Sequence, residues 1–128
     1  MDLPIMPSNN QHIGPFGEWA SLIYLQFNGL KLITKNYRCR YGEIDLIMTS
    51  LNQCIFVEVK SRTSTSFYNP LFSISPLKQQ RIIKTSEHFL EKNPLYQYCN
   101  IRYDAVLVNL QRHSIDWIPD AFTPQIPF

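Results

Sequence analysis

Two short segments in the middle of the chain carry side chains that could perform metal-assisted chemistry. One contains Asp45, and the other contains Glu58 and Lys60, which are two positions apart. Because side chains alternate across a β-strand, Glu58 and Lys60 should point to the same face of their strand. The short turn at residues 51–53 predicts an antiparallel hairpin, and a hairpin can lay Asp45 beside Glu58. The sequence therefore predicts two carboxylates and one ammonium group on one face of a sheet.

Such a cluster suits the hydrolysis of phosphodiester bonds. Mg²⁺ prefers oxygen ligands and keeps several waters, so two carboxylates can hold it and leave room for a phosphate oxygen. The metal ion stabilises developing charge and lowers the pKa of its water, and a nearby lysine can orient that water. The same alternation is also typical of a half-exposed sheet in which Glu58 and Lys60 form a solvated pair. The residues alone leave both interpretations open.

Basic residues gather around these side chains. The segment from Lys31 to Lys84 holds nine of the twelve Lys and Arg residues and three acids, a net charge of +6, whereas the rest of the chain carries −4. A polyanion held by cations and processed at a carboxylate-bound metal would need this combination. Ordinary solvated lysines and arginines are the alternative.

Helices and strands at regular spacing must position the cluster. Pro15 and Gly29 delimit a helix over residues 15–28, and Ser75 is a good N-cap for a second helix over residues 76–92. The β-forming segments predict strands at 30–38, 43–49, 54–61, 101–110 and 114–118. In the second of these strands, Ile44 and Leu46 should share the face opposite Asp45. Residues from 119 onward should be extended.

Length and composition bound the rest of the organisation. The 128 residues, of which 45% are apolar and 17% charged, suit a single domain over residues 13–122. Residues 1–12 read as a flexible leader and residues 123–128 as an extended tail. No apolar run approaches the ~20 residues that span a membrane, and the start lacks a secretory signal. Three widely spaced cysteines without a CxxC pair argue against disulfides and zinc, so we expect a cytoplasmic protein.

Several motifs recur together in an order that is typical of a known family. They are Gly17-Glu18 in the first helix, Gly42-Glu43-Ile44-Asp45-Leu46, then Phe56-Val57-Glu58-Val59-Lys60 with Arg62, and finally Lys78 and Arg81. From about residue 14 to residue 122 the chain resembles the YraN-like family of small bacterial proteins, which is endonuclease-like. The order is also similar to the PD-(D/E)xK nuclease superfamily, particularly archaeal Holliday junction resolvases. One departure is Tyr68 after Phe67, where the family usually has a glycine, so the shape of that loop is not implied.

The resemblance implies an α/β, restriction-endonuclease-like fold with a central mixed β-sheet flanked by helices. It implies that Asp45 and Glu58 bind Mg²⁺ or Mn²⁺, with the Val59 carbonyl as a further ligand. Lys60 would be the catalytic lysine, and Glu18 would complete the site from the first helix. Without a site, Glu18 is an acid in the first turn of a helix, where the helix dipole favours it.

Further residues are implied to bind nucleic acid. These are Arg62, Lys78, Arg81 and Arg40, each of which could also be a solvated surface charge. Glu43 either joins the site or pairs with a surface arginine.

Three functions are compatible with these observations. The leading hypothesis is a Mg²⁺- or Mn²⁺-dependent nuclease acting on DNA, with branched or damaged DNA as candidate substrates. The second is a non-catalytic DNA-binding module with the nuclease fold. The third is a small α/β interaction protein without nucleic acid, which the modest pI of about 8.5 favours. No membrane partner is expected, a homodimer follows only by analogy with junction resolvases, and no protein partner is indicated.

Overall fold

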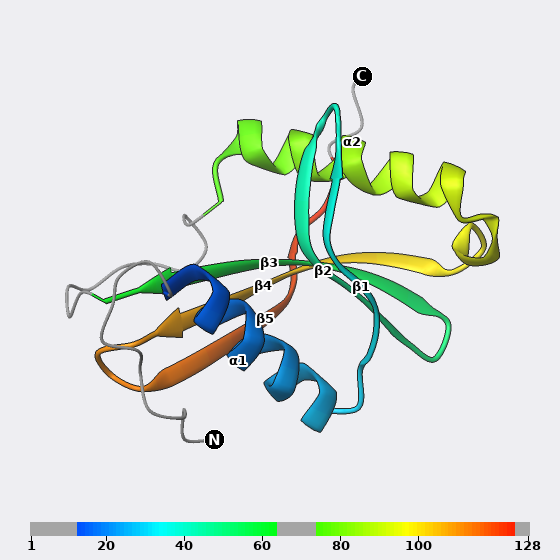
Figure 1. Cartoon of the computed structure of the whole chain (residues 1–128). Helices are drawn as coiled ribbons and strands as arrows, with labels where there is room; N and C mark the ends of the chain where they lie inside the picture. Colours follow the sequence, from blue (N-terminus) through cyan, green and yellow to red (C-terminus); the bar gives the residue numbers. More distant parts are fainter. Residues whose placement is uncertain (1–12, 64–73, 125–128) are drawn as a thin grey trace.

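The sheet of this protein is built from strands that are consecutive in the chain. The computed structural model describes residues 13–63 and 74–124 (Figure 1). Its elements are α1 (Ile13–Phe27), β1 (Lys31–Cys39), β2 (Gly42–Ser50), β3 (Gln53–Arg62), α2 (Pro76–Lys92), the 3₁₀ helix η3 (Pro94–Tyr96), β4 (Asn100–Asn109) and β5 (Ser114–Phe122). The expected leader, residues 1–12, and the loop residues Phe67 and Tyr68 lie outside the described residues.

The five strands form one mixed sheet in the order β1-β2-β3-β4-β5. All neighbours are antiparallel except β3 and β4, which are parallel and joined through the crossover that contains α2. The two helices cover opposite faces of the sheet (Figure 1). The predicted α/β class, a central mixed sheet flanked by helices, is confirmed.

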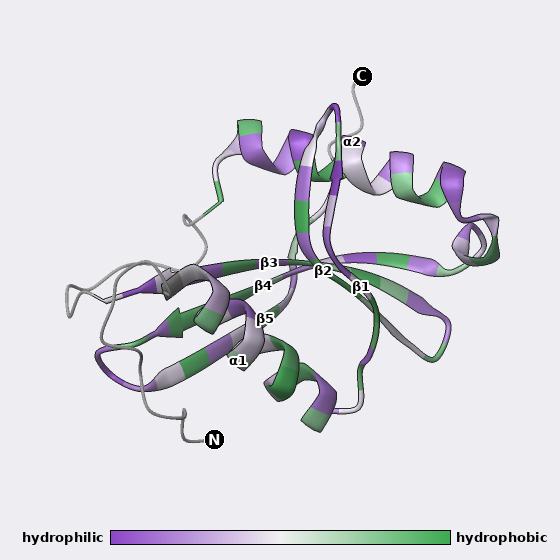
Figure 2. Ribbon diagram, viewed as in Figure 1, coloured by the Kyte–Doolittle hydropathy of each residue, from purple (hydrophilic) through white to green (hydrophobic). Residues whose placement is uncertain are grey.

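Each helix seals its own hydrophobic core against β3. On the α2 side, the Phe56 ring lies 6.0 Å from the ring of Phe89 and 5.7 Å from that of Tyr103. On the α1 side, Leu25 packs in one cluster with the fully buried Ile55 and Val57. Figure 2 shows hydrophobic residues along the central strands and a mixture of hydrophilic and hydrophobic residues along α2. Alternation along β3 therefore builds both cores and leaves Glu58 and Lys60 on the α2 side.

Gly29 and Ser75 act where predicted, whereas α1 begins at Ile13 rather than at Pro15, which places Glu18 beyond its first turn. Gly29 adopts φ = 94° just past α1, and the N–H of Leu30 donates to the carbonyl of Leu25 at 3.1 Å, which closes the helix end. The Ser75 hydroxyl accepts a hydrogen bond from the N–H of Lys78 at 3.2 Å and caps α2. Neither α1 nor α2 is long and apolar enough to cross a membrane.

The last strand is longer than the sequence predicted. β5 continues to Phe122, whose backbone pairs with Tyr103 beyond a register shift. The sequence predicted a strand only to residue 118 because Pro119 and Asp120 disfavour strands. The pairing continues because Asp120 adopts φ = 54° and its N–H donates to the Asp104 carboxylate at 2.9 Å.

Asp104 is the buried node that joins β4 to β5. It is fully buried and accepts two hydrogen bonds of 2.8 Å from the Arg102 guanidinium. The indole N–H of Trp117 donates to the same carboxylate at 2.9 Å, as does the amide of Asp120. Asp104 therefore has a structural role in joining these strands.

We expect Asp104→Ala to lower the free energy of unfolding by about 3–5 kcal/mol, because it leaves the Arg102 charge and two further donors without their acceptor. Urea denaturation followed by circular dichroism would measure the loss. The matched control is Asp116→Ala, an exposed aspartate on β5, which should stay within about 0.5 kcal/mol of the wild type. Equal stability of the two variants would contradict the assignment.

Candidate active site

The site begins where β2 separates from β3. Pairing between these strands runs from Ser50 opposite Gln53 to Leu46 opposite Val57, and the remainder of β2 pairs with β1. In the opening, the Asp45 carboxylate reaches β3, and its Oδ2 accepts the N–H of Val59 at 2.8 Å. The Asp45 side chain thus accepts the hydrogen bond of a β3 amide that has no backbone partner on β2.

The strand β2 also twists at this point. Ile44 packs in the core on the α2 side, whereas Leu46 packs in the core on the α1 side. The expectation that these two residues share one face is wrong. The twist arises because the β1–β2 hairpin leaves the plane of the sheet and its tip packs along α2 (Figure 1).

Glu58 lies on β3 beside two lysines. Its side chain is only 7% exposed, and its Oε1 lies 2.6 Å from the Nζ of Lys78. Lys78 comes from the first turn of α2, so the Ser75 cap that starts this helix also positions the ammonium group. Lys60, two positions along β3 from Glu58, lies within hydrogen-bonding reach of Lys78.

The two lysines have opposite pKa shifts. Burial lowers the pKa of Lys60, and the neighbouring Lys78 lowers it further. Burial would also lower the pKa of Lys78, but the hydrogen bond and charge of Glu58 overcome it and raise that pKa. Lys78 is therefore the firmly charged partner of Glu58, and Lys60 is the lysine closer to losing its proton.

Glu18 reaches the same place from α1. Its carboxyl group lies close enough to that of Asp45 for the two to influence each other's pKa. In the orientation that satisfies both groups, the side-chain nitrogen of Asn36 lies 3.2 and 3.3 Å from the two Glu18 oxygens. Burial, followed by the charge of Asp45, raises the pKa of Glu18 to about 7. Glu18 thus lies beside Asp45, and the role that the resemblance implied for it stays a prediction.

All three carboxyl groups are destabilised as anions. Burial raises the pKa values of Asp45 and Glu58, and nearby carboxylates (Glu43 for Asp45, and Asp45 for Glu58) raise them further. Hard carboxylate oxygens that are crowded and desolvated are the donor set that suits Mg²⁺ or Mn²⁺. Within residues 13–63 and 74–124, however, no three His, Cys, Asp or Glu side chains already form a metal-holding group. Lys78 instead neutralises Glu58.

Gly17 allows α1 to approach β3 closely enough to deliver Glu18. A Cβ at this position would lie 1.8 Å from Oγ and 3.1 Å from Cβ of Ser61. Such distances cannot be accommodated without a shift of the helix or the strand.

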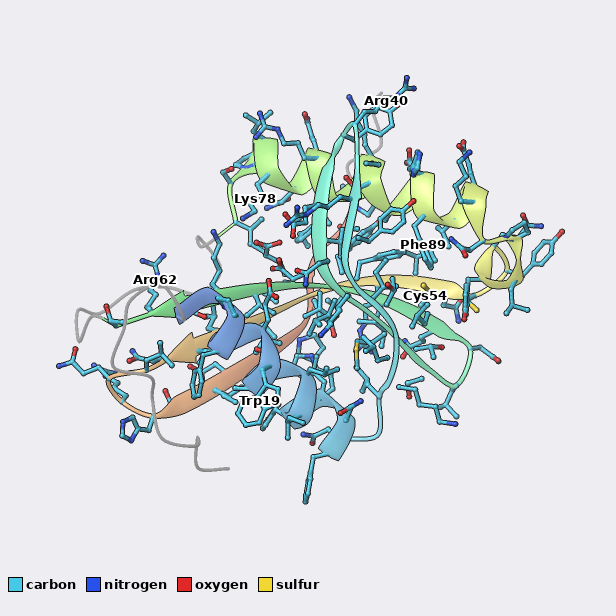
Figure 3. The ribbon with its side chains drawn as sticks, in the orientation of Figure 1. Trp19, Arg40, Cys54, Arg62, Lys78 and Phe89 are labelled. Atoms are coloured by element: carbon cyan, nitrogen blue, oxygen red, sulfur yellow. The ribbon has the colours of Figure 1, made fainter. Side chains whose placement is uncertain are left out.

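The remaining predicted residues surround the cluster without entering it. Oε1 of Glu43 lies 3.4 Å from Nε of Arg38. Of the two roles expected for Glu43, this is the pairing with a surface arginine. Arg40 lies at the tip of the β1–β2 hairpin, where its guanidinium carbon is 4.8 Å from the centre of the Tyr41 ring. In Figure 3, Arg40, Lys78 and Arg62 lie at three separate places, the hairpin tip, the start of α2 and the end of β3. They could therefore contact one ligand together only if that ligand is extended.

Two hollows adjoin the carboxylates. The α2 hollow, of about 410 Å³, is lined by Asp45, Glu58, Lys78 and Arg81, among others. The α1 hollow, of about 450 Å³, lies between α1 and the β1–β2 hairpin, and Glu18 lines it. Glu43 lines both hollows, so they are neighbours along the hairpin.

Sequence reasoning missed Asn36 as a part of the site. It adopts φ = 54° within β1, a conformation that asparagine tolerates better than most residues. An asparagine inside an otherwise β-forming run was the available signal. Lys78 was expected to contact phosphate, and its pairing with Glu58 was not foreseen.

Fold and site together define an α/β protein in which carboxylates and lysines converge where the central strands diverge. The chain belongs to the uncharacterised protein family UPF0102, whose family model matches residues 17–108. The resemblance to the YraN-like family is thereby confirmed, and this family is a member of the PD-(D/E)xK-like nuclease superfamily. The narrower similarity to Holliday junction resolvases stays a prediction.

Relatives from several bacteria match almost end to end. A UPF0102 protein of Coxiella burnetii (strain RSA 331 / Henzerling II) is 42% identical over 116 residues, which cover 91% of this chain and 96% of the relative. One from Legionella pneumophila (strain Philadelphia 1) is 41% identical over 112 residues, covering 88% and 95%. One from Psychromonas ingrahamii is 38% identical over 122 residues, covering 95% and 98%.

A solved structure gives a weaker match. Pyrococcus furiosus SfsA in complex with Ca²⁺ is 14% identical, with a TM-score of 0.36. The match covers 87% of this chain and 64% of SfsA, so the chain spans less than two thirds of that protein. A TM-score this low carries no argument about fold or function.

The close approach at Gly17 predicts a coupled pair of substitutions. Gly17→Ala should destabilise the protein by about 1–3 kcal/mol because the new methyl group overlaps Ser61. In a Ser61→Gly background the same substitution should cost close to nothing, since both contacting atoms are gone. Urea denaturation of the four proteins in this double-mutant cycle measures the coupling, and purely additive effects would contradict the packing described.

The raised pKa of Glu18 predicts a pH-dependent stability. In metal-free buffer the folded protein binds a proton at Glu18 that the unfolded chain, with a pKa near 4.5, has released. The free energy of unfolding should therefore fall as pH rises from about 4.5 through about 7.

Urea denaturation between pH 4.5 and 8 tests this expectation. Glu18→Gln should reduce the slope, while Glu91→Gln, an exposed site on α2, should keep the wild-type slope. An unchanged slope in Glu18→Gln would show that Glu18 does not titrate in this range.

Proposed function

We propose that this chain is a Mg²⁺- or Mn²⁺-dependent nuclease that hydrolyses phosphodiester bonds in DNA. The observation that carries the proposal is the convergence of Glu18, Asp45 and Glu58 from α1, β2 and β3, with two lysines beside them. Burying Glu58 and half-burying Glu18 and Asp45 beside it costs stability. A bound cation would offset that cost, because it would neutralise the carboxylates.

Glu18, Asp45 and Glu58 would hold the metal ion, and the Val59 carbonyl is a further candidate ligand. The bound ion would stabilise charge on a phosphate and lower the pKa of a water. The hydrogen bond from the Val59 N–H to Oδ2 of Asp45 joins this segment of β3 to the Asp45 carboxylate.

The lysines and arginines would act on the substrate directly. Lys60, with its lowered pKa, can hold or release a proton beside the scissile phosphate. Lys78 and Arg81 line the α2 hollow and would neutralise phosphate oxygens there. Arg62 at the end of β3 and Arg40 at the hairpin tip would contact more distant phosphates.

A non-catalytic DNA-binding module is the second candidate. It is favoured by the 2.6 Å ion pair between Lys78 and Glu58, which satisfies Glu58 without a metal ion. A homodimer and a cytoplasmic location stay predictions, as does the choice of branched or damaged DNA. Light scattering during gel filtration, with the protein alone and with DNA, measures the oligomeric state. A strict monomer under both conditions would exclude the homodimer.

Calorimetric titration with Mn²⁺ separates the two candidates. The wild type should bind, and Asp45→Asn and Glu58→Gln should each lose binding by at least about tenfold because each removes an anionic ligand. Glu91→Gln, an exposed glutamate on α2, is the matched control and should bind as the wild type does.

A panel of linear, nicked, forked and four-way DNA, incubated with each protein and Mn²⁺, reports cleavage. Metal-dependent cleavage by the wild type, lost in both variants, supports the nuclease. Metal binding without cleavage of any substrate favours the binding module. A folded wild type that binds no Mn²⁺, even with DNA present, would overturn the proposed metal site.

A further inference from the structure

The α1 hollow combines an open aromatic face with basic side chains. Trp19 is 49% exposed although its ring packs against Phe16, with the ring centroids 5.9 Å apart. The opposite side of the hollow carries Lys35 and Arg38 of β1, and Glu18 lines the same hollow. None of the roles proposed above uses Trp19, Lys35 or Arg38.

An irregularity in β1 brings the two cations to one place. Residues three apart on a regular strand point to opposite faces. Lys35 and Arg38 nevertheless line the same hollow, and between them Asn36 departs from the strand with φ = 54°. The same residue holds the Glu18 carboxyl group. One backbone distortion therefore links the basic wall of the hollow to the candidate metal site.

We propose that the α1 hollow binds an unpaired base of a DNA strand, stacked on Trp19, with the adjoining phosphates on Lys35 and Arg38. This inference rests on the proposed function and specifies its substrate as DNA with a single-stranded segment. Every base has a π-face, so stacking on an indole does not require a particular sequence. A base within a duplex is stacked on its neighbours and cannot offer that face.

The α1 hollow adjoins the proposed place of cleavage. Glu18 belongs to both the carboxylate cluster and the α1 hollow, and Glu43 lines both hollows. A strand whose unpaired base lies on Trp19 would thus pass the carboxylates on its way to Lys78 and Arg81. The ion pair between Arg38 and Glu43 is exposed and therefore weak, so it leaves Arg38 able to contact a phosphate.

Fluorescence anisotropy with EDTA present measures binding without cleavage. The probes are a fluorescein-labelled oligothymidylate of roughly 12 nucleotides, within the range of known single-strand site sizes, and a blunt duplex with the same label. We expect Trp19→Ala to weaken binding of the single strand about 5- to 100-fold, the range for loss of one stacked base. Binding of the blunt duplex should change less than about twofold, because no base is unpaired.

Three further variants make the test specific. Trp19→Phe keeps an aromatic face and should retain most of the affinity, which separates stacking from a loss of folding. Lys35→Ala with Arg38→Ala should reduce the dependence of affinity on salt. Tyr98→Ala, which removes a 91% exposed aromatic residue that does not line the α1 hollow, is the control and should bind as the wild type does.

The outcomes distinguish this inference from the proposed function. Loss of single-strand binding in Trp19→Ala supports the hollow even if no DNA is cleaved. Cleavage of DNA by a wild type that does not bind the single strand, or unchanged single-strand binding in Trp19→Ala, would overturn the hollow and leave the nuclease intact. A protein that neither binds nor cleaves DNA would overturn both.

Discussion

Mutual repulsion among three desolvated carboxyl groups is the constraint around which the candidate site is organised. Two charges of one sign about 4 Å apart repel by about 4 kcal/mol near a protein surface, far more than one hydrogen bond returns. Each group has a different partner: Asn36 contacts Glu18, the Val59 amide contacts Asp45, and Lys78 contacts Glu58. These three contacts stabilise the carboxyl groups one by one. They do not cancel the net negative charge of the cluster.

The β1–β2 hairpin makes this arrangement geometrically feasible. Because β2 pairs with β3 only from Leu46 onward, Asp45 can fill the opening that a continuous ladder would close. The hairpin is fixed against α2 by the hydroxyl of Tyr37, 2.6 Å from Nδ1 of His88. It is also fixed at Gly42, which adopts φ = 152° and where a Cβ would lie 3.4 Å from Thr85. The strand divergence is thus held by packing far from the carboxylates themselves.

Residue alternation and hairpin length predicted a large part of this structure. They placed Glu58 and Lys60 on one face and Asp45 next to β3, and capping residues predicted the helix ends. The twist between Ile44 and Leu46 was not predictable, because it depends on where the hairpin meets α2. The Lys78–Glu58 pair and the Asn36 contact were missed for a related reason: each joins elements whose relative placement no local pattern specifies.

Charge balance argues for what the cluster is suited to bind. With all groups ionised, Glu18, Asp45 and Glu58 against Lys60 and Lys78 leave a local charge of −1, and the raised pKa of Glu18 follows partly from this excess. A divalent cation would change the sum to +1, and a phosphodiester, which carries −1, would bring it to zero. Without the cation, the carboxylates would repel the phosphate that the lysines attract. The proposed metal ion would therefore let the carboxylate cluster itself accept a phosphate, whereas the basic side chains outside the cluster would attract one without the ion.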